Sequence, residues 1–360
     1  IQKVISEAAF SLEIRALAAK ALEEELRTII SKPFDLELDF MLRSSLFKIG
    51  EDQYVLAIVV HHIAFDAWSL SILVSELRAL YREYDEGLKS ELPPLAIQYA
   101  DYSKWERQAL QGGQLARQLS YWETKLDNIH TLKLPTDYTR PAVNTTVCKR
   151  VVFELNAELQ DKLQLLAKQN GATLFMLLLA IFKVLLYRYT NSTDICVGTA
   201  IANRGHKKIE PLIGFFVNNL ALRTALSPKD SFLTALQAVT QTTLAAYDEQ
   251  AAPFELVVKR TIGQRDRSRS PLFQTMFLLQ NAALLPSVEL GNTQIAIRSH
   301  DIIRSEYDLT LAAYELNDRL AFNVDYCVDL FSEERMQRLA THYQNLVEAL
   351  IADPTQKISH

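Results

Sequence analysis

Residues 59–69, "VVHHIAFDAWS", place two adjacent histidines and an aspartate between two apolar segments. The preceding residues 53–60, "QYVLAIVV", are almost wholly apolar, which predicts a strand with both faces covered. After the motif, leucine, valine and tyrosine recur at helical spacing, which predicts an amphipathic helix over residues 69–86. The motif is therefore expected in a turn between a strand and a helix.

The two histidines allow two interpretations. Because successive side chains of a strand alternate between its faces, His61 and His62 are expected to point in opposite directions. They cannot easily bind one metal ion together, and no nearby His or Cys supplies a third ligand, so no metal site is expected. An imidazole titrates near neutral pH and can accept or relay a proton during attack on a carbonyl. The pair is either part of an acyl-transfer site or a buried pair with ordinary hydrogen bonds.

Asp66 also has two interpretations, which are compatible. It can cap the N-terminus of the following helix, with Ser69 as the competing cap. It can also be a fixed anion that pairs with an arginine and holds the histidine-bearing turn in shape.

Strands and helices are mixed along the rest of the chain. Residues 12–31 predict a helix, and residues 41–50 predict a strand that forms a hairpin with residues 53–60. Further strands are predicted at 147–155, 194–204, 215–226 and 271–281; helices are predicted from about residue 97 to 126, twice within 157–189, and at 231–249 and 333–352. This mixture indicates an α/β or α+β fold.

The chain is long enough for two lobes, since single cores usually stop growing at about 250–300 residues. It has 360 residues, and we expect an N-terminal lobe over 1–125, which contains the histidine motif, and a C-terminal lobe over 126–360.

The composition excludes several classes of protein. With 49% hydrophobic and 22% charged residues the chain is globular, and a net charge of -5 argues against nucleic acid as a partner. Three widely spaced cysteines predict buried or half-buried thiols. The longest apolar run, 173–189, is interrupted by Lys183 and predicts a buried helix and no membrane span. No signal peptide is visible, so a cytoplasmic location is expected.

"HHIAFDAWS" resembles the HHxxxDG motif of the condensation domains of nonribosomal peptide synthetases, which are relatives of chloramphenicol acetyltransferase. Four later segments resemble further motifs of this family in the same order: "IQYADYSKWERQ" (97–108), "IGFFVNNLALR" (213–223), "YDEQAAPFELVV" (247–258) and "RDRSRSPLFQTMFLLQN" (265–281).

The chain departs from the family pattern at several positions. Ala67 stands where the family usually has glycine, a change that we expect the turn to tolerate. Asn219, Glu249 and Ala251 also differ from the usual residues. The two opening motifs of the family are missing, so we expect the chain to begin inside the first lobe, N-terminally truncated.

The resemblance implies two acetyltransferase-like lobes arranged in a V, with the first lobe incomplete. The implied reaction is amide formation between a donor acyl or peptidyl thioester and an acceptor aminoacyl thioester. Upstream and downstream peptidyl carrier domains would deliver both substrates on phosphopantetheine arms, and an adenylation domain would be adjacent. The domain itself would bind no cofactor.

The resemblance also suggests roles for individual residues. His62 would be catalytic, supported by His61, Asp66 and Ala67. Arg204 is the expected partner of Asp66, and Arg223 is the alternative. Further candidates for a position in or near the substrate channel are Asn218, Gln280 and Asn281.

Other functions within the superfamily remain to be separated. A cyclisation domain is excluded because histidines stand at 61 and 62 where it has aspartates. An epimerisation domain usually adds a later E-G-H-G-R-E motif, which this chain lacks. A coenzyme A-dependent acyltransferase and a noncatalytic recruitment domain stay open, although the latter typically lacks the second histidine.

Overall fold

The computed structural model describes residues 10–87, 89, 92–111, 113–263, 266–280, 288–290, 293–296, 303–316 and 318–359. Contacts between residues divide the chain into two compact units. Unit 1 comprises Ile1–Ala109, Ala202–Val217 and Val288–Ile295, and unit 2 comprises the remainder.

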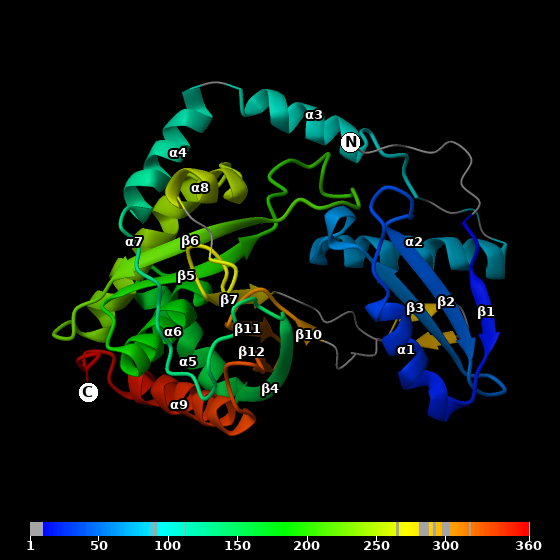
Figure 1. The fold of residues 1–360 in the computed structure, drawn as a ribbon. Coiled ribbons are helices and arrows are strands. Elements are labelled where there is room, and N and C mark those ends of the chain that lie inside the picture. The colour runs from blue at the N-terminus through cyan, green and yellow to red at the C-terminus, as the bar shows by residue number, and fades with distance from the viewer. Residues whose placement is uncertain are drawn as a thin grey trace. The chain divides into compact units, whose positions relative to one another are not determined.

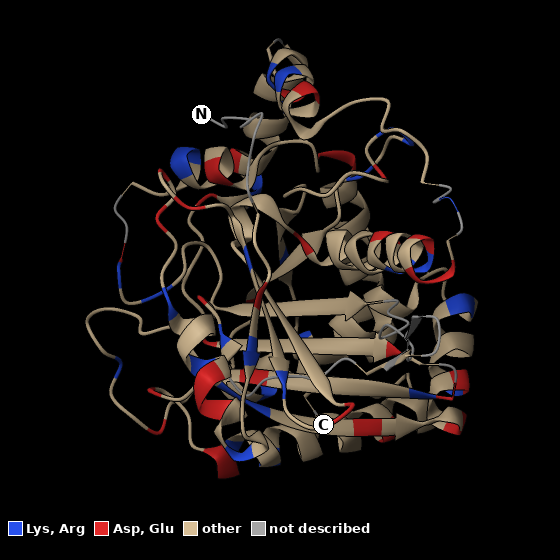
Figure 2. Ribbon diagram, turned by 90° about the vertical axis from the view of Figure 1, so that its right-hand side faces the viewer, with Lys and Arg blue, Asp and Glu red and all other residues tan. Residues whose placement is uncertain are grey.

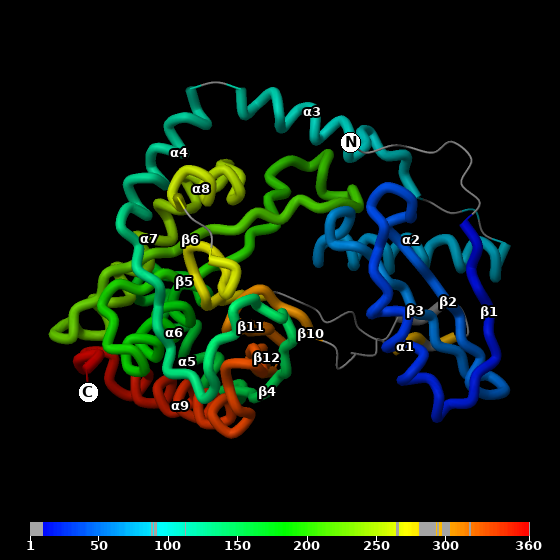
Figure 3. The backbone as a smooth tube through the Cα atoms, viewed as in Figure 1, coloured from blue at the N-terminus to red at the C-terminus, as the bar shows by residue number. Residues whose placement is uncertain are grey.

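The contacts cut the chain at residues 109 and 110, earlier than the expected boundary at 125 and 126, and group two later segments with the N-terminal part. One of these segments is residues 202–217, which can be found by colour along the backbone in Figure 3. As a division into functional lobes, the boundary after residue 125 stays a prediction.

Unit 1 contains a three-stranded sheet of β1 (Glu13–Ala16), β2 (Leu42–Lys48) and β3 (Tyr54–Val60) in that order. β2 and β3 form the predicted antiparallel hairpin. The short helix η1 (Ala19–Ala21) leads into α1 (Leu22–Ser31), which packs against β2 through Phe47.

Two predictions for this sheet were wrong. The helix expected over 12–31 begins only at η1, because residues 13–16 pair with β2 as a parallel strand and this pairing overrides local helix propensity. The described residues cover only one face of β3. Val55 and Ala57 pack next to α1, whereas Tyr54, Leu56 and Ile58 are 52%, 40% and 37% exposed, as is common for a strand in an antiparallel pair such as β2 and β3.

Unit 1 also contains α2 (Ala67–Glu86), α3 (Tyr99–Ala109) and the antiparallel pair β8 (Val288–Leu290) and β9 (Thr293–Ile295). The predicted helix at 69–86 is confirmed and begins two residues earlier. The single helix predicted to end near residue 126 was wrong: α3 ends at Ala109, and α4 (Gly113–Leu126) follows it in unit 2. The glycines of "QGG" (111–113) disfavour a continuous helix.

Unit 2 is built on a seven-stranded mixed sheet (Figure 1). In spatial order its strands are β10 (Ile303–Arg304), β4 (Val147–Asn156), β12 (Arg319–Cys327), β11 (Leu309–Glu315), β7 (Thr275–Gln280), β5 (Asp194–Ile201) and β6 (Asn218–Ala225). Its helices after α4 are α5 (Ala157–Gln169), α6 (Leu174–Thr190), α7 (Phe232–Asp248), α8 (Phe254–Thr261) and α9 (Glu333–Ala352). The predicted mixed fold class is confirmed.

α6 lies at the centre of the core of unit 2. All of its residues from Met176 to Tyr187 are buried, which confirms the buried helix predicted from the apolar run. Lys183 is fully buried among them and donates to the carbonyl of Leu222 at 2.6 Å and to the hydroxyl of Thr224 at 2.7 Å. The three cysteines are buried free thiols, as predicted.

Charged residues lie mainly on the helices and loops, which carry most of the red and blue bands in Figure 2, while the strands are largely tan. Within the described part of the chain, no single helix has the length and apolar character of a membrane span; α5 and α6 pass that test only as a pair bent by 100°.

Candidate active site at the start of helix α2

His61 ends the strand-like backbone and begins a single turn of 3-10 helix, η2 (His62–Ala64). Its backbone N–H donates to the carbonyl of Met41 at 2.9 Å, and its Nδ1 accepts from the backbone N–H of Ile63 at 3.1 Å. Phe34 packs edge-on to its ring at 5.6 Å between centroids. These contacts make His61 part of the framework of the turn.

His62 is exposed, and one hydrogen bond fixes which of its nitrogens carries the proton. Nδ1 lies 2.6 Å from the carbonyl oxygen of Phe65. Because a carbonyl oxygen can only accept, Nδ1 must donate, and in the neutral ring Nε2 is left as an acceptor. Phe215 contacts the ring edge-on at 5.2 Å between centroids. The exposed ring is thus held at a fixed orientation, and its Nε2 has no hydrogen-bond partner among the described residues.

The prediction that strand alternation separates the two histidines rested on a wrong assumption, because β3 ends at Val60 and His62 already belongs to η2. The two rings nevertheless contact different neighbours, Phe34 and Phe215.

Asp66 combines both predicted roles. It is 1% exposed and caps α2, because its Oδ1 accepts from the backbone N–H of Ser69 at 2.9 Å. The Ser69 hydroxyl lies 2.7 Å from the same oxygen, and Oδ2 accepts from the backbone N–H of Phe216 at 3.2 Å. A carboxylate that is removed from water needs this number of donors to remain charged.

Arg204 supplies the positive charge that faces Asp66. Its Nη2 lies 3.0 Å and 3.1 Å from the two carboxylate oxygens, and the two side chains are 2% and 0% exposed. Its Nη1 donates to the carbonyls of Ile209 at 2.8 Å and Leu212 at 2.7 Å. Burial lowers the pKa of Arg204, and the charge of Asp66 acts in the opposite direction. The guanidinium links α2 to the segment 202–217.

The segment 202–217 also packs on α2 and α3 by close contact. Gly214 N–H donates to the Ser69 hydroxyl at 3.1 Å, and the Tyr99 hydroxyl donates to the carbonyl of Phe215 at 2.6 Å. A Cβ added to Gly214 would lie 2.3 Å from the Tyr99 ring, so only glycine fits there. The guanidinium of Arg204 stacks 4.0 Å above the Phe216 ring. These contacts place Phe215 beside His62.

Ala67 is the first residue of α2, where φ is negative, and it is not among the residues with a positive φ. Alanine is therefore accommodated at the position where the family usually has glycine.

The remaining predicted candidates lie in unit 2 or outside the described residues. Arg223 pairs with Asp194 at 2.7 Å and not with Asp66. Asn218 donates to the carbonyls of Gln250 and Ala252, both at 2.9 Å, and accepts from the N–H of Phe254 at 3.0 Å, so it braces the start of α8.

Gln280 is the half-buried last residue of β7. Asn281 lies outside the described residues.

Sequence reasoning missed Phe215, Gly214 and Tyr99 as parts of the site, and it considered Ser69 only as a competing cap of the helix. All four lie in segments that carried the resemblance, but nothing in one sequence says which of those residues touch the histidine turn. Within the described part of the chain, no group of three or more His, Cys, Asp and Glu side chains is arranged to hold a metal ion.

Comparison with known proteins gives the same family as the motifs. The condensation-domain family model matches residues 1–360. A linear gramicidin synthase from Brevibacillus parabrevis is 41% identical over 357 residues, which is 97% of this chain and 7% of the relative. Bacitracin synthase 3 from Bacillus licheniformis is 37% identical over 349 residues, which is 97% of this chain and 5% of the relative. The chain thus spans a small part of the curated relatives that it matches.

Solved structures agree with this assignment. The X-domain from teicoplanin biosynthesis is 27% identical, and the match covers 99% of this chain and 82% of that chain with a TM-score of 0.93. The X-domain in its complex with OxyB from teicoplanin biosynthesis matches with 28% identity and a TM-score of 0.90, over 99% of this chain and 80% of that chain. The predicted chloramphenicol acetyltransferase-like fold is confirmed, and the chain belongs to the condensation-domain family of nonribosomal peptide synthetases.

Proposed function

We propose that this chain catalyses amide bond formation between a donor acyl or peptidyl thioester and the amine of an acceptor aminoacyl thioester. The observation that carries the proposal is the 2.6 Å contact between Nδ1 of His62 and the carbonyl of Phe65, which leaves Nε2 of an exposed imidazole as an acceptor. Condensation domains are generally acyltransferase-type, peptide-bond-forming domains.

In the proposed reaction the acceptor amine attacks the donor carbonyl carbon. A C–N bond forms, the C–S bond breaks, and the proton lost by the nitrogen ends on the departing thiolate. The thioester is already activated, so no enzyme nucleophile is needed. Nε2 of His62 takes the proton from the attacking nitrogen or orients it by accepting its hydrogen bond. Positioning of the two tethered substrates supplies the rest of the rate enhancement, since proximity alone is worth about 7–11 kcal/mol in favourable cases.

Asp66 and Arg204 act as positioning residues in this proposal. They hold residues 202–217 against the start of α2, and this segment carries Phe215, which contacts the His62 ring. Neither side chain is exposed to a substrate.

We further propose that upstream and downstream peptidyl carrier domains present the substrates on phosphopantetheine arms, and that an adenylation domain is a neighbour in the synthetase. The domain itself is proposed to bind no cofactor.

The direct test combines the purified chain with separately prepared donor and acceptor carriers, each loaded on its phosphopantetheine arm. Mass spectrometry of the acceptor carrier should show the amide product only when both carriers are present. The same donor as a coenzyme A thioester should give far less product. Equal product from coenzyme A would favour the coenzyme A-dependent alternative, and no product under any condition would contradict the proposal.

A noncatalytic recruitment function is the second candidate, favoured by the TM-score of 0.93 to the X-domain from teicoplanin biosynthesis. One such X-domain forms a complex with OxyB. His62, which recruitment domains typically lack, favours catalysis. A chain that forms no amide in the carrier assay but binds a partner enzyme in a size-exclusion experiment would establish the second candidate instead.

A further inference from the structure

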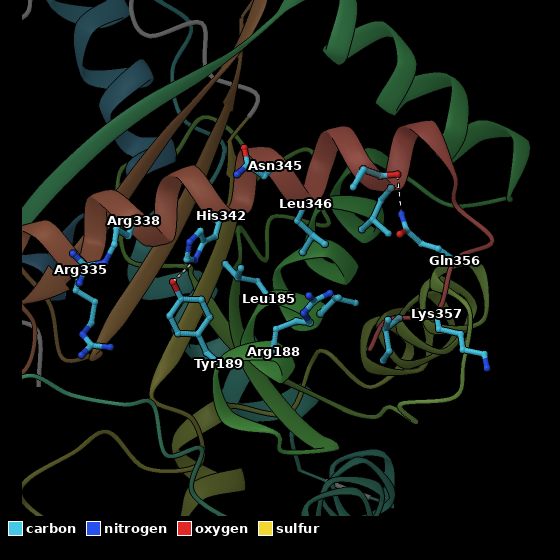
Figure 4. Close-up of a pocket in the computed structure, with 14 residues that line it drawn as sticks. Leu185, Arg188, Tyr189, Arg335, Arg338, His342, Asn345, Leu346, Gln356 and Lys357 are labelled. Carbon is cyan, nitrogen blue, oxygen red and sulfur yellow. Dashed lines mark hydrogen bonds between the residues drawn. The ribbon is translucent and has the colours of Figure 1, made fainter. Parts of the chain in front are cut away.

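A groove in unit 2 lies far from the histidine motif in sequence and has no part in the proposed chemistry. It is formed by α6, α9 and residues 356–358, and has a volume of about 670 Å³ (Figure 4). This is within the range of cavities that bind ligands or peptide side chains. Apolar side chains of α6 and α9, together with Ile358, line it; they include Val184, Leu185, Leu346 and Leu350.

The wall formed by the C-terminal segment is held in place by hydrogen bonds. Gln356 donates from Nε2 to the carbonyl of Ala349 at 2.8 Å, as drawn in Figure 4, and its own carbonyl accepts from the N–H of Phe232 at 3.0 Å. Ile358 is 1% exposed, and its N–H donates to the carbonyl of Asp230 at 3.0 Å. The groove is therefore preformed and does not depend on a loose tail.

The charged side chains among the described lining residues are all basic. None of the 14 described lining residues is acidic, whereas Arg188, Arg335, Arg338 and Lys357 are basic. Asp137 neutralises Arg335 through contacts of 2.7 Å and 2.6 Å. Arg338 and Lys357 are exposed and form no ion pair with a described residue. This local positive charge contrasts with the net charge of -5 of the whole chain.

A small anion does not suit this geometry. The exposed cations lie around a floor of leucine, valine and isoleucine, and no buried cationic side chain faces that floor among the described lining residues. A dehydrated phosphate would meet few donors there, and hydrated phosphate would leave the apolar floor uncovered. An occupant with both apolar and acidic side chains suits both the apolar floor and the cations around it. Charge complementarity determines which partner binds, and burial of apolar surface supplies affinity.

We propose that this groove binds an acidic amphipathic segment of a partner polypeptide, with apolar side chains on the floor and carboxylates beside Arg338 and Lys357. The proposal does not rest on the chemistry assigned to His62.

The test measures binding of a synthetic peptide by fluorescence anisotropy. The probe is a fluorescein-labelled peptide with leucine at the first and fourth positions of each heptad and glutamate elsewhere, which places the leucines on one face when the peptide is helical. The double variant Arg338→Glu/Lys357→Glu should weaken binding by at least roughly tenfold. The matched control Lys133→Glu, which removes an exposed lysine elsewhere in unit 2, should change it by less than about twofold.

Two further arms separate groove binding from general attraction of opposite charges. Asn345→Trp adds bulk at an exposed groove position without changing charge, and should also weaken binding by roughly tenfold. A peptide in which serine replaces leucine keeps the charge and should bind at least roughly tenfold more weakly than the probe. Circular dichroism checks that each variant is folded.

The proposal is overturned if the acidic peptide does not bind, if the double variant binds as the wild type does, or if the serine peptide binds as tightly as the probe. Binding of inorganic pyrophosphate in isothermal titration calorimetry, with no binding of the leucine–glutamate peptide, would identify a small-anion site instead and would also overturn it.

Discussion

At the scale of single residues, the site depends on how three polar side chains are satisfied. The carbonyl of Phe65 determines the tautomer of His62, and Arg204 neutralises Asp66 in a region closed to water. The contact with Phe65 leaves the Nε2 acceptor on an exposed His62 ring, whereas the pair of Asp66 and Arg204 is buried. Substitution of His62 should therefore change mainly the reaction rate, whereas substitution of Asp66 should change stability as well.

Asp66→Asn should lower both stability and turnover. Removing one partner of a buried pair leaves the other charge unpaired, which typically costs about 3–5 kcal/mol. Urea unfolding followed by circular dichroism measures this loss. The control is Glu86→Gln, which removes the exposed partner of Arg82 in the same helix and should cost less than about 1 kcal/mol. A well-folded, inactive Asp66→Asn protein would mean that Asp66 takes part in the chemistry directly.

At the scale of elements, the segment 202–217 is placed by close packing as well as by charge. Gly214 lies against Tyr99, and the hydroxyl of Tyr99 holds the carbonyl of Phe215. The segment therefore has little room to move relative to α3 and the start of α2.

Gly214→Ala should destabilise the protein by about 1–3 kcal/mol, because the added methyl group would overlap the Tyr99 ring. Gly205→Ala is the matched control in the same segment, since nothing lies within 4 Å of its added Cβ, and should change stability by less than about 0.5 kcal/mol. Thermal unfolding of both variants makes the comparison. Equal melting temperatures would show that the segment adjusts freely.

Lys183 in α6 makes stability depend on pH. Burial lowers its pKa to about 7 from 10.5, while burial raises the pKa of the nearby Cys196 thiol to about 12. Between about pH 7 and 10.5 the unfolded chain binds more protons at this lysine than the folded chain, so Lys183 contributes a free energy of unfolding that rises with pH in that window. Above pH 9.0, the ordinary pKa of the thiol, Cys196 contributes in the opposite direction.

The slope contributed by Lys183 should approach about 1.4 kcal/mol per pH unit and should disappear in Lys183→Met. Urea unfolding of both proteins at several pH values above neutrality measures the difference. Parallel stability curves would mean that Lys183 stays charged in the folded state.

Sequence patterns predicted elements whose local signal agrees with their packing. The apolar run of α6 and the periodicity of α2 are examples. β1 could not be predicted, because its strand conformation depends on hydrogen bonds to β2, which follows it by some twenty-five residues. The exposed face of β3 could not be predicted either, because an apolar sequence does not say whether a second layer covers it.

For the site, the motif identified His62 and Asp66, but only the family resemblance selected Arg204 among the arginines. The other contacts of the site could not be predicted because they join residues that are far apart in sequence. Ser69 and Gly214, for example, are 145 residues apart and meet only after folding.

At the scale of the whole chain, the two units differ in the size of their cores. Unit 2 contains one extensive cluster of buried side chains around α6 and its sheet. Unit 1 contains two small clusters, one around Phe47 and one around Phe216. Stability should therefore be distributed unevenly between the units.

Native-state hydrogen exchange followed by mass spectrometry should detect this difference. Amides of β2 and β3 should open at free energies lower than those of β5, β11 and β12 by about 2 kcal/mol or more. Uniform protection across all five strands would mean that the chain unfolds as one cooperative body.

The most direct test of the central claim is the single-turnover rate of amide formation by His62→Ala with loaded donor and acceptor carriers. Because the ring is exposed, its removal should leave the melting temperature nearly unchanged, while loss of the Nε2 acceptor should lower the rate by about 10²–10⁴-fold. His130→Ala, which removes an exposed histidine of unit 2, should keep the wild-type rate. A folded His62→Ala protein that forms the amide at the wild-type rate would contradict the account.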